Sequence, residues 1–307
     1  MINSNQKASQ PGDNMKARNS IRSAIFALLL STLSYQLSTF AQGPLTPPGA
    51  PAPTMKTLDQ IEARTAISSA PFTITQPGSY YLTTNLNVTS GDAITINTNQ
   101  VTLDLNGFTI SSTTASASGY AIQLAVPGGN SDITIFNGHI KSGVTNNAGV
   151  FAGPGFRSGI DEPGVTVQNV RVTGVSVSGI LSYGIYLGVN NSSVVESCTV
   201  KTVGYNGIVA DSVSRCTVNE CGSYGIYATT ASDCHADAVG NGTGLYTTTA
   251  NNCYGSSTGS GTGLYASGSA IGCYGSSASG VGINAHLANS CTVGGGTTNI
   301  TYKYNMP

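Results

Sequence analysis

The 307-residue chain has no tryptophan, and Lys, Arg, Asp and Glu together make up only 8% of it. With 12 basic and 13 acidic residues the formal net charge is −1, so no excess of either sign would attract nucleic acid or an anionic membrane. Its repeated part also lacks any uninterrupted amphipathic run of about 10 to 12 residues, which a helix prediction needs. These absences argue against a nucleic-acid partner and leave strands and turns as the building elements.

What the chain does contain is a short unit that recurs between Gly184 and Gly294. A Gly followed by Ile or Leu marks each unit, and after a first step of 23 residues the steps are 18, 19, 19 and 19. Cysteine is a second marker, with steps of 18, 18, 19, 20 and 18. Two markers that keep one period indicate a structural repeat. The cysteines of this series are Cys198, Cys216, Cys234, Cys253, Cys273 and Cys291.

One unit is too short to bury its own apolar side, so the units must stack, each rung adding about 4.8 Å by parallel strand pairing. Because strand side chains alternate, Cys198 and Val200 should point inward, and Thr199 and Lys201 outward. The Leu-x-x-Leu-x-Leu frame of leucine-rich repeats is absent. The sequence therefore predicts an all-β parallel β-helix, a solenoid of about ten rungs with a length near 50 Å.

The first residues have a different pattern. Residues 1–41 read as a secretory signal peptide, because basic residues precede an apolar run from Ala24 to Leu33 and a small-residue cleavage site ends at Ala41. The run of about ten apolar residues is too short to span a bilayer of about 30 Å. A retained signal-anchor is the alternative. We expect an exported protein, secreted or held at the cell envelope, with no membrane span in its mature form.

Two further segments follow the signal peptide. Residues 42–54 carry five of the twelve prolines and predict an extended linker. Residues 55–307 form the predicted β-helix domain. At its start, Thr57 and Gln60 have the spacing of a capping box, which predicts a short N-terminal capping helix over 57–64. Such a helix would cover the open apolar end of the first rung.

Longer rungs precede the regular repeat. Leu103, Ile133 and Val165 lie in similar alternating segments, and aligning them predicts that these early rungs carry long loops. The largest of these loops covers residues 142–164 and contains several aromatic and charged side chains.

Several segments form a recognisable set: Val-Thr-Leu-Asp-Leu-Asn-Gly-Phe-Thr-Ile at 101–110, its Asn137-Gly138 echo, and the Gly-Ile-Tyr and Cys-Thr-Val series. Together they resemble right-handed parallel β-helix proteins of the pectate-lyase-like superfamily. Residues 55–82 are similar to a group of secreted bacterial β-helix proteins of unassigned activity. The superfamily contains lyases, glycoside hydrolases, esterases, tailspikes and adhesins, so the resemblance implies a right-handed coil and leaves the activity open. The family's catalytic patterns, an Asp-Asp pair, Arg-x-Lys and a calcium-binding acidic row, are absent.

Seven cysteines in an exported chain would ordinarily indicate disulfides. Six of them recur at one inward phase, as small buried apolar residues do, and we expect free thiols. Adjacent rungs would place their Cα atoms about 5 Å apart, so pairing remains the alternative. Cys221 lies outside the series. A line of thiols along an axis does not converge on a metal ion, and we expect neither a metal nor a cofactor.

The only cluster of Asp, His and Arg in the repeats contains Arg215, Asp233, His235 and Asp237. Aligned on the cysteines, these residues fall at outward positions of adjacent rungs, where Arg215 could pair with Asp233. An Asp or His there could act as acid or base on a polysaccharide, with Arg215 opposite a uronate. Asp233 and Asp237 would be about 13 Å apart, beyond the usual range for a glycoside hydrolase. A solvated ion pair beside an exposed histidine is the alternative.

Tyrosines form two further rows. Tyr227, Tyr246 and Tyr265 share one outward phase, and Tyr254 and Tyr274 share another. Such rows can bind the apolar faces of sugar rings, or they can stack on one another and stabilise the solenoid.

We therefore expect a non-catalytic protein whose partner is an extracellular polysaccharide or the cell-envelope surface. The first alternative is a polysaccharide lyase or glycoside hydrolase acting on uronate-type polymers, with the loop 142–164 as one wall of its site. The second alternative is a structural or adhesive surface rod.

Overall fold

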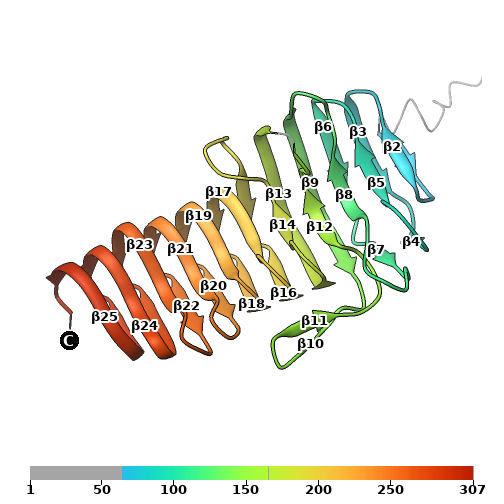
Figure 1. Cartoon of the computed structure of the whole chain (residues 1–307). Helices are drawn as coiled ribbons and strands as arrows, with labels where there is room; N and C mark the ends of the chain where they lie inside the picture. Colours follow the sequence, from blue (N-terminus) through green and yellow to red (C-terminus); the bar gives the residue numbers. More distant parts are fainter. Residues whose placement is uncertain (1–63, 165, 307) are drawn as a thin grey trace, which may run out of the picture. The chain divides into compact units, whose positions relative to one another are not determined.

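The computed structural model describes residues 64–164 and 166–306, which form a right-handed parallel β-helix without an α-helix in these ranges (Figure 1). The prediction of an all-β solenoid is confirmed. The predicted signal peptide (1–41), the linker (42–54) and all but the last residue of the predicted capping helix (57–64) lie outside the described residues.

The strands of successive rungs pair in parallel and form three columns, which we call walls A, B and C. Wall A contains β2 (Phe72–Ile74), β5 (Ile94–Ile96), β8 (Tyr120–Leu124), β12 (Ser158–Asp161), β14 (Ile185–Tyr186) and the first parts of β17 (Ile208–Ser214), β19 (Tyr224–Ser232), β21 (Thr243–Asn251) and β23 (Thr262–Ile271). Wall B contains β1 (Thr65–Ile67), β3 (Gly78–Leu82), β6 (Val101–Asp104), the first parts of β9 (Asn130–Lys141) and β13 (Val167–Ile180), and β15 (Val194–Glu196). The last parts of β17, β19, β21 and β23, whose first parts belong to wall A, complete it.

Wall C completes each rung. It contains β4 (Leu86–Val88), β7 (Thr109–Ser112), the last parts of β9 and β13, β16 (Thr199–Val203), β18 (Thr217–Cys221), β20 (His235–Ala238) and β22 (Tyr254–Ser257). The long strands β24 (Tyr274–Asn289) and β25 (Thr292–Tyr304) continue over all three walls. Only β10 (Thr145–Asn147) and β11 (Val150–Ala152) pair antiparallel among the described strands, as a hairpin that projects from the coil (Figure 1).

One inward column on wall C passes through ten rungs, each residue paired with the next. Its members are Leu86, Ile110, Ile140, Val177, Val200, Val218, Ala236, Gly255, Gly275 and Val293. The predicted number of about ten rungs is thus confirmed. Alternation is confirmed as well, because Cys198 and Val200 are buried, whereas Thr199 and Lys201 are exposed.

The cysteine series lies in the core. All seven cysteines are buried free thiols, which confirms the prediction for the six of the series. Adjacent members touch: the backbone N–H of Cys198 donates to Sγ of Cys216 at 3.4 Å, and that of Cys273 donates to Sγ of Cys291 at the same distance. Cys221 stands outside the series and pairs in register with Val203.

The glycine that marks each unit has a steric origin. A Cβ added at Gly207 would lie 2.4 Å from Cγ1 of Val218 and 2.5 Å from the carbonyl oxygen of Gly225 in the next rung. Successive coils approach too closely at this place for any side chain. The repeated Gly therefore marks the position where each coil enters wall A.

The alignment predicted for the early rungs is wrong by two residues at the first step and by five at the second. Leu103 pairs with Ile135, and Ile133 pairs with Val101 on one side and Val170 on the other. Val165 lies outside the described residues. A shift of two keeps every side chain on the same face, so the alternating pattern did not distinguish the two registers.

The predicted loop 142–164 is also shorter than expected. Its residues 158–161 are strand β12 of wall A, paired with β8 and β14. Phe156, just before this strand, is fully buried in the core.

Candidate functional site

The predicted catalytic cluster lies where wall B turns into wall C. Arg215 and Asp233 occupy this corner in successive rungs, and His235 and Asp237 follow on β20. A shallow pocket of about 510 Å³ opens here. Its lining includes Arg215, Asp233, His235, Tyr254 and Tyr274.

The polar groups of this cluster contact neighbours within the solenoid. His235 Nε2 lies 2.8 Å from Asp237 Oδ2, and the other carboxylate oxygen of Asp237 accepts a hydrogen bond from the Ser256 hydroxyl. The His235 ring stacks on Tyr254, with centroids 4.3 Å apart. These contacts hold each group in place along the wall.

The prediction that Arg215 pairs with Asp233 is wrong. Arg215 pairs with Glu196 of the preceding rung, and Glu196 also lies 3.6 Å from Arg171. No ion pair joins Arg215 to Asp233 within the described ranges, where the Asp233 carboxylate accepts a hydrogen bond from the Asn252 amide at 3.4 Å.

Backbone conformation explains which residues occupy the corner. All six positions directly before a cysteine of the series have φ between 51° and 61°, the left-handed region that Asn, Asp and Gly tolerate best. Asp233 thus has a conformational reason for its identity. The six are Ser197, Arg215, Asp233, Asn252, Gly272 and Ser290.

The two predicted tyrosine rows stack. Tyr227 and Tyr246 have centroids 4.9 Å apart at 24°, Tyr246 and Tyr265 are 4.5 Å apart at 10°, and Tyr254 and Tyr274 are 4.9 Å apart at 5°. Parallel rings at this distance cover one another's faces. What these rows present to solvent is therefore mainly ring edges and hydroxyl groups, which leaves little room for a sugar ring on a ring face.

Further tyrosines, whose rings are tilted, lie on wall A and in the turns that lead into it. Tyr183 contacts Tyr186 at 4.7 Å and meets Tyr205 edge-on, at 5.4 Å and 84°. Tyr224 packs at 65° against Tyr246. Because tilted rings do not cover one another completely, parts of their faces remain accessible, and Tyr205 is 46% exposed.

These tyrosines form one surface, which we call the tyrosine face. In the register of wall A, Asp161 is followed by Tyr186, Val209 and Tyr227, and then by the stacked Tyr246 and Tyr265. Val209 is only 3% exposed, so almost none of its side chain reaches the surface between Tyr186 and Tyr227. The other members are Tyr183, Tyr205 and Tyr224.

A pocket of about 500 Å³ lies at the N-terminal end of the tyrosine face, and we call it the acidic pocket. Strands β8, β12 and β14 and the turn after β12 supply its walls. The side chains with chemistry to offer are Tyr120, Arg157, Asp161, Glu162, Tyr183 and Tyr186.

The carboxyl groups of the acidic pocket are the buried ones. Asp161 is 5% exposed and Glu162 8%, whereas Arg157 is exposed. Burial raises the pKa of Asp161, and hydrogen bonds from Ser158 and from the Glu162 backbone, followed by the charge of Arg157, act in the opposite direction. Burial, followed by the charge of Glu162, raises the pKa of Tyr186, and burial, followed by the charge of Asp161, raises that of Tyr120. At neutral pH these phenols are therefore hydrogen-bond donors.

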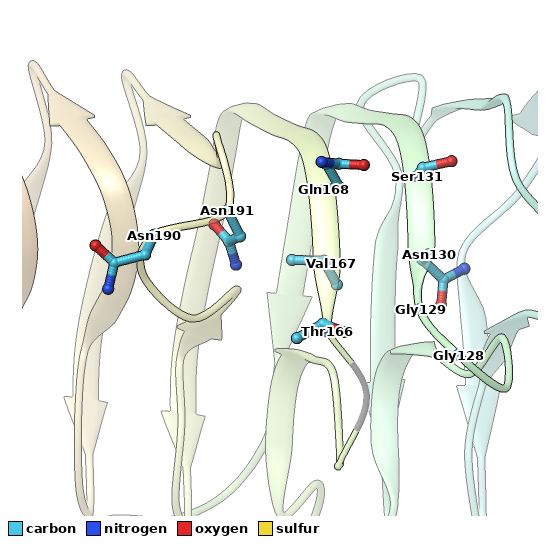
Figure 2. Close-up of a pocket in the computed structure, with 9 residues that line it drawn as sticks. All are labelled: Gly128, Gly129, Asn130, Ser131, Thr166, Val167, Gln168, Asn190 and Asn191. Atoms are coloured by element: carbon cyan, nitrogen blue, oxygen red, sulfur yellow. The ribbon is translucent and has the colours of Figure 1, made fainter.

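A second pocket, of about 400 Å³, adjoins the acidic pocket and shares Thr166 with it. Figure 2 shows that its lining comes from three successive rungs and consists of glycines and uncharged side chains, among them Gln168, Asn190 and Asn191. The Asn130 amide donates to the carbonyl oxygens of Ile96 and Thr98, so it shapes this turn. We call this hollow the amide pocket.

Sequence reasoning did not single out Tyr120, Tyr183 or Tyr186 as site residues. Tyr186 follows the same Gly-Ile marker as Tyr227, which was the available signal, but the step of 23 residues between the first two markers concealed the shared column. The expectation that the loop 142–164 would supply one wall of a site remains a prediction. Arg157, Asp161 and Glu162 of this segment do line the acidic pocket.

Among the residues that the structure describes, no three His, Cys, Asp or Glu side chains are grouped to hold a metal ion. The described ranges also contain no helix able to cross a membrane. No family model, no curated protein and no solved structure matches this chain. The parallel β-helix rests on the structure, and membership of the pectate-lyase-like superfamily stays a prediction.

Proposed function

We propose that this chain is an exported β-helix protein of the pectate-lyase-like kind that binds a polysaccharide outside the cell, without catalysis, along wall A. The observation that carries the proposal is the continuity of the tyrosine face with the acidic pocket. A long surface with a hollow at one end suits a polymer that lies across several rungs and inserts one residue.

The chemistry of the tyrosine face supports this binding mode. The tilted rings of Tyr183, Tyr205 and Tyr224 offer partial faces for the apolar side of a sugar ring. The stacked Tyr227, Tyr246 and Tyr265 offer a row of hydroxyls that repeats at the rung spacing of about 4.8 Å. A regular row of donors and acceptors matches the regular hydroxyls of a polysaccharide.

A second candidate is hydrolysis or lyase chemistry on a polysaccharide, including the uronate polymers considered from the sequence. Two buried carboxyls favour it, because a general acid needs a raised pKa and burial raises that of Asp161. The sequence predicted this chemistry for Asp233, His235 and Asp237 on wall C, which lie outside the acidic pocket. Incubating the protein with a polysaccharide panel and measuring reducing ends and unsaturated-uronate absorbance tests this candidate.

Affinity electrophoresis on the same panel tests binding. We expect at least one polysaccharide to retard the protein, and Tyr183→Ala to weaken that retardation at least tenfold. Tyr254→Ala is the matched control, because it removes a tyrosine of wall C. The proposal fails if no polysaccharide retards the protein, or if Tyr254→Ala weakens binding as much as Tyr183→Ala does. A change in stability alone would leave the structural rod as the better description.

A further inference from the structure

We propose that the acidic pocket recognises a positively charged amino group, so that the preferred ligand is a polysaccharide containing free amino sugars. This inference rests on the proposed polysaccharide binding and names its substrate class. It differs from the uronate polymers considered from the sequence, because those carry the opposite charge.

The distribution of charge within the pocket carries the argument. Two carboxylates, those of Asp161 and Glu162, line its buried part, and Arg157 is exposed. A group that enters the pocket therefore meets negative charge where the surroundings are least hydrated and interactions are strongest. A uronate carboxylate would be repelled there, whereas an ammonium group would be attracted.

The burial of Asp161 favours the same ligand. Asp161 is 95% covered by protein and forms no ion pair with another described residue. Hydrogen bonds from Ser158 and the Glu162 backbone, and the charge of exposed Arg157, offset only part of the cost of burial, because the net effect of the surroundings raises the pKa of Asp161. A buried ionised carboxylate is costly unless a cation accompanies it. An ammonium group supplied by the ligand would provide that cation, so binding would relieve a cost that the free protein carries.

The remaining surfaces suit the rest of an amino sugar. The hydroxyls of Tyr120, Tyr183 and Tyr186 can donate to sugar oxygens beside the ammonium group. The adjoining amide pocket presents neutral side chains, which suits neighbouring residues of the polymer that carry hydroxyls only. Volumes of about 500 and 400 Å³ lie within the ordinary range of ligand pockets.

The test uses four oligosaccharides of equal length, made of glucosamine, N-acetylglucosamine, glucose or galacturonate. Isothermal titration calorimetry at pH 6 measures their affinity for the full-length protein and for Asp161→Asn, Glu162→Gln and Asp233→Asn. Asp233→Asn is the matched control, since it removes an exposed carboxylate outside the pocket. Thermal unfolding of each variant checks that it is folded.

We expect the glucosamine oligomer to bind at least tenfold more tightly than the glucose and N-acetylglucosamine oligomers, and the galacturonate oligomer not to bind. Asp161→Asn should reduce this preference at least tenfold and leave the affinity for neutral oligomers unchanged, whereas Asp233→Asn should change neither. Glu162→Gln repeats the test if Asp161→Asn does not fold.

The outcomes separate this inference from the proposed function. Equal binding of the amino and neutral oligomers, or tighter binding of galacturonate, would overturn the amino-sugar inference and leave polysaccharide binding intact. An amino preference that survives in both pocket variants would also overturn it. If no polysaccharide of any kind binds, the proposed function fails as well.

Discussion

The N-terminal and C-terminal halves of the solenoid have the same three walls but different cores. In one inward column of wall C, the first rungs contribute Leu86, Ile110 and Ile140, whereas the later rungs contribute Gly255 and Gly275. We call the rungs before β17 the wide half and the rungs from β17 to β25 the narrow half. At this column the wide half is filled by large aliphatic side chains, whereas in the narrow half the backbone of Gly255 and Gly275 packs against the backbone of the facing strand.

The difference also decides where the surface is hollow. In the narrow half, walls A and B are joined by continuous strands such as β19 and β21. In the wide half the connections are separate turns, among them 125–129, 162–164 and 187–193, and these turns supply residues of both pockets. The narrow rungs thus form regular ladders of Tyr and Cys, and the wide rungs form the acidic pocket and the amide pocket.

The largest expected effect comes from emptying a wide rung. Ile140→Ala would remove a side chain that is 1% exposed and leave a cavity, which costs about 2 to 5 kcal/mol. Urea unfolding would measure this loss. The outward neighbour Lys141→Ala is the control, with an expected change within about 0.5 kcal/mol. A loss below 1 kcal/mol for Ile140→Ala would mean that the wide coils are not held by their aliphatic core.

The opposite change should damage a narrow rung. A Cβ at Gly275 would lie 2.3 Å from the Gly282 carbonyl oxygen and 2.3 Å from Ile283 Cγ1, so Gly275→Ala must push walls C and A of the same coil apart. We expect a loss of about 1 to 3 kcal/mol, the usual cost of overpacking. Ser276→Ala on the same strand is the control. If Gly275→Ala is as stable as the unmodified protein in urea unfolding, the narrow half has spare volume and the comparison fails.

A smaller, pH-dependent effect is expected in the acidic pocket, where Arg157, Glu162 and three tyrosines face Asp161. Burial raises the pKa of Asp161 above its unfolded value of about 3.9, so the folded state holds the proton more tightly. Stability is therefore lost as pH rises from the unfolded pKa through the raised folded pKa. An Asn cannot ionise and avoids this loss.

Asp161→Asn without ligand should consequently gain stability relative to the unmodified protein between pH 3 and pH 7. Urea midpoints at pH 3, 5 and 7 would measure the trend, with Asp233→Asn as the control at an exposed position. A relative stability of Asp161→Asn that stays constant or falls with pH would show that Asp161 is well solvated. That result would also weaken the argument for an ammonium ligand.

Much of the fold could be predicted because its regular half repeats a marker in every rung. Gly207 is required sterically, and its counterparts recur wherever the coil enters wall A. The register of the wide half could not be predicted, since Val101 and Leu103 both point inward and a shift of two residues preserves the pattern. Sequence alternation specifies a face but not a partner.

The site was harder to predict than the fold. The prediction that Arg215, Asp233 and His235 lie close together is confirmed, because these residues fall in regular rungs. It did not reveal that Arg215 and Asp233 occupy left-handed corners, or that Asp161 and Tyr186 are neighbours across an irregular step. Residues in long, unequal turns become neighbours through backbone paths that no periodic pattern encodes.

The smallest expected effect tests the corner between walls B and C. Arg215 has φ of 52°, which costs a side chain such as Arg more than it costs Asn, so Arg215→Asn should relieve backbone strain. The same change removes the exposed ion pair with Glu196, worth about 0.2 to 1 kcal/mol and screened by salt. The two effects should nearly cancel at low salt, and at 1 M salt the variant should be the more stable.

Ser197→Asn, at a corner with φ of 53° and no ion pair among the described residues, is the control and should gain stability at both salt concentrations. If urea unfolding shows a loss above 1 kcal/mol for Arg215→Asn at high salt, the role of Arg215 is not conformational, and its place in the pocket of wall C would call for a ligand.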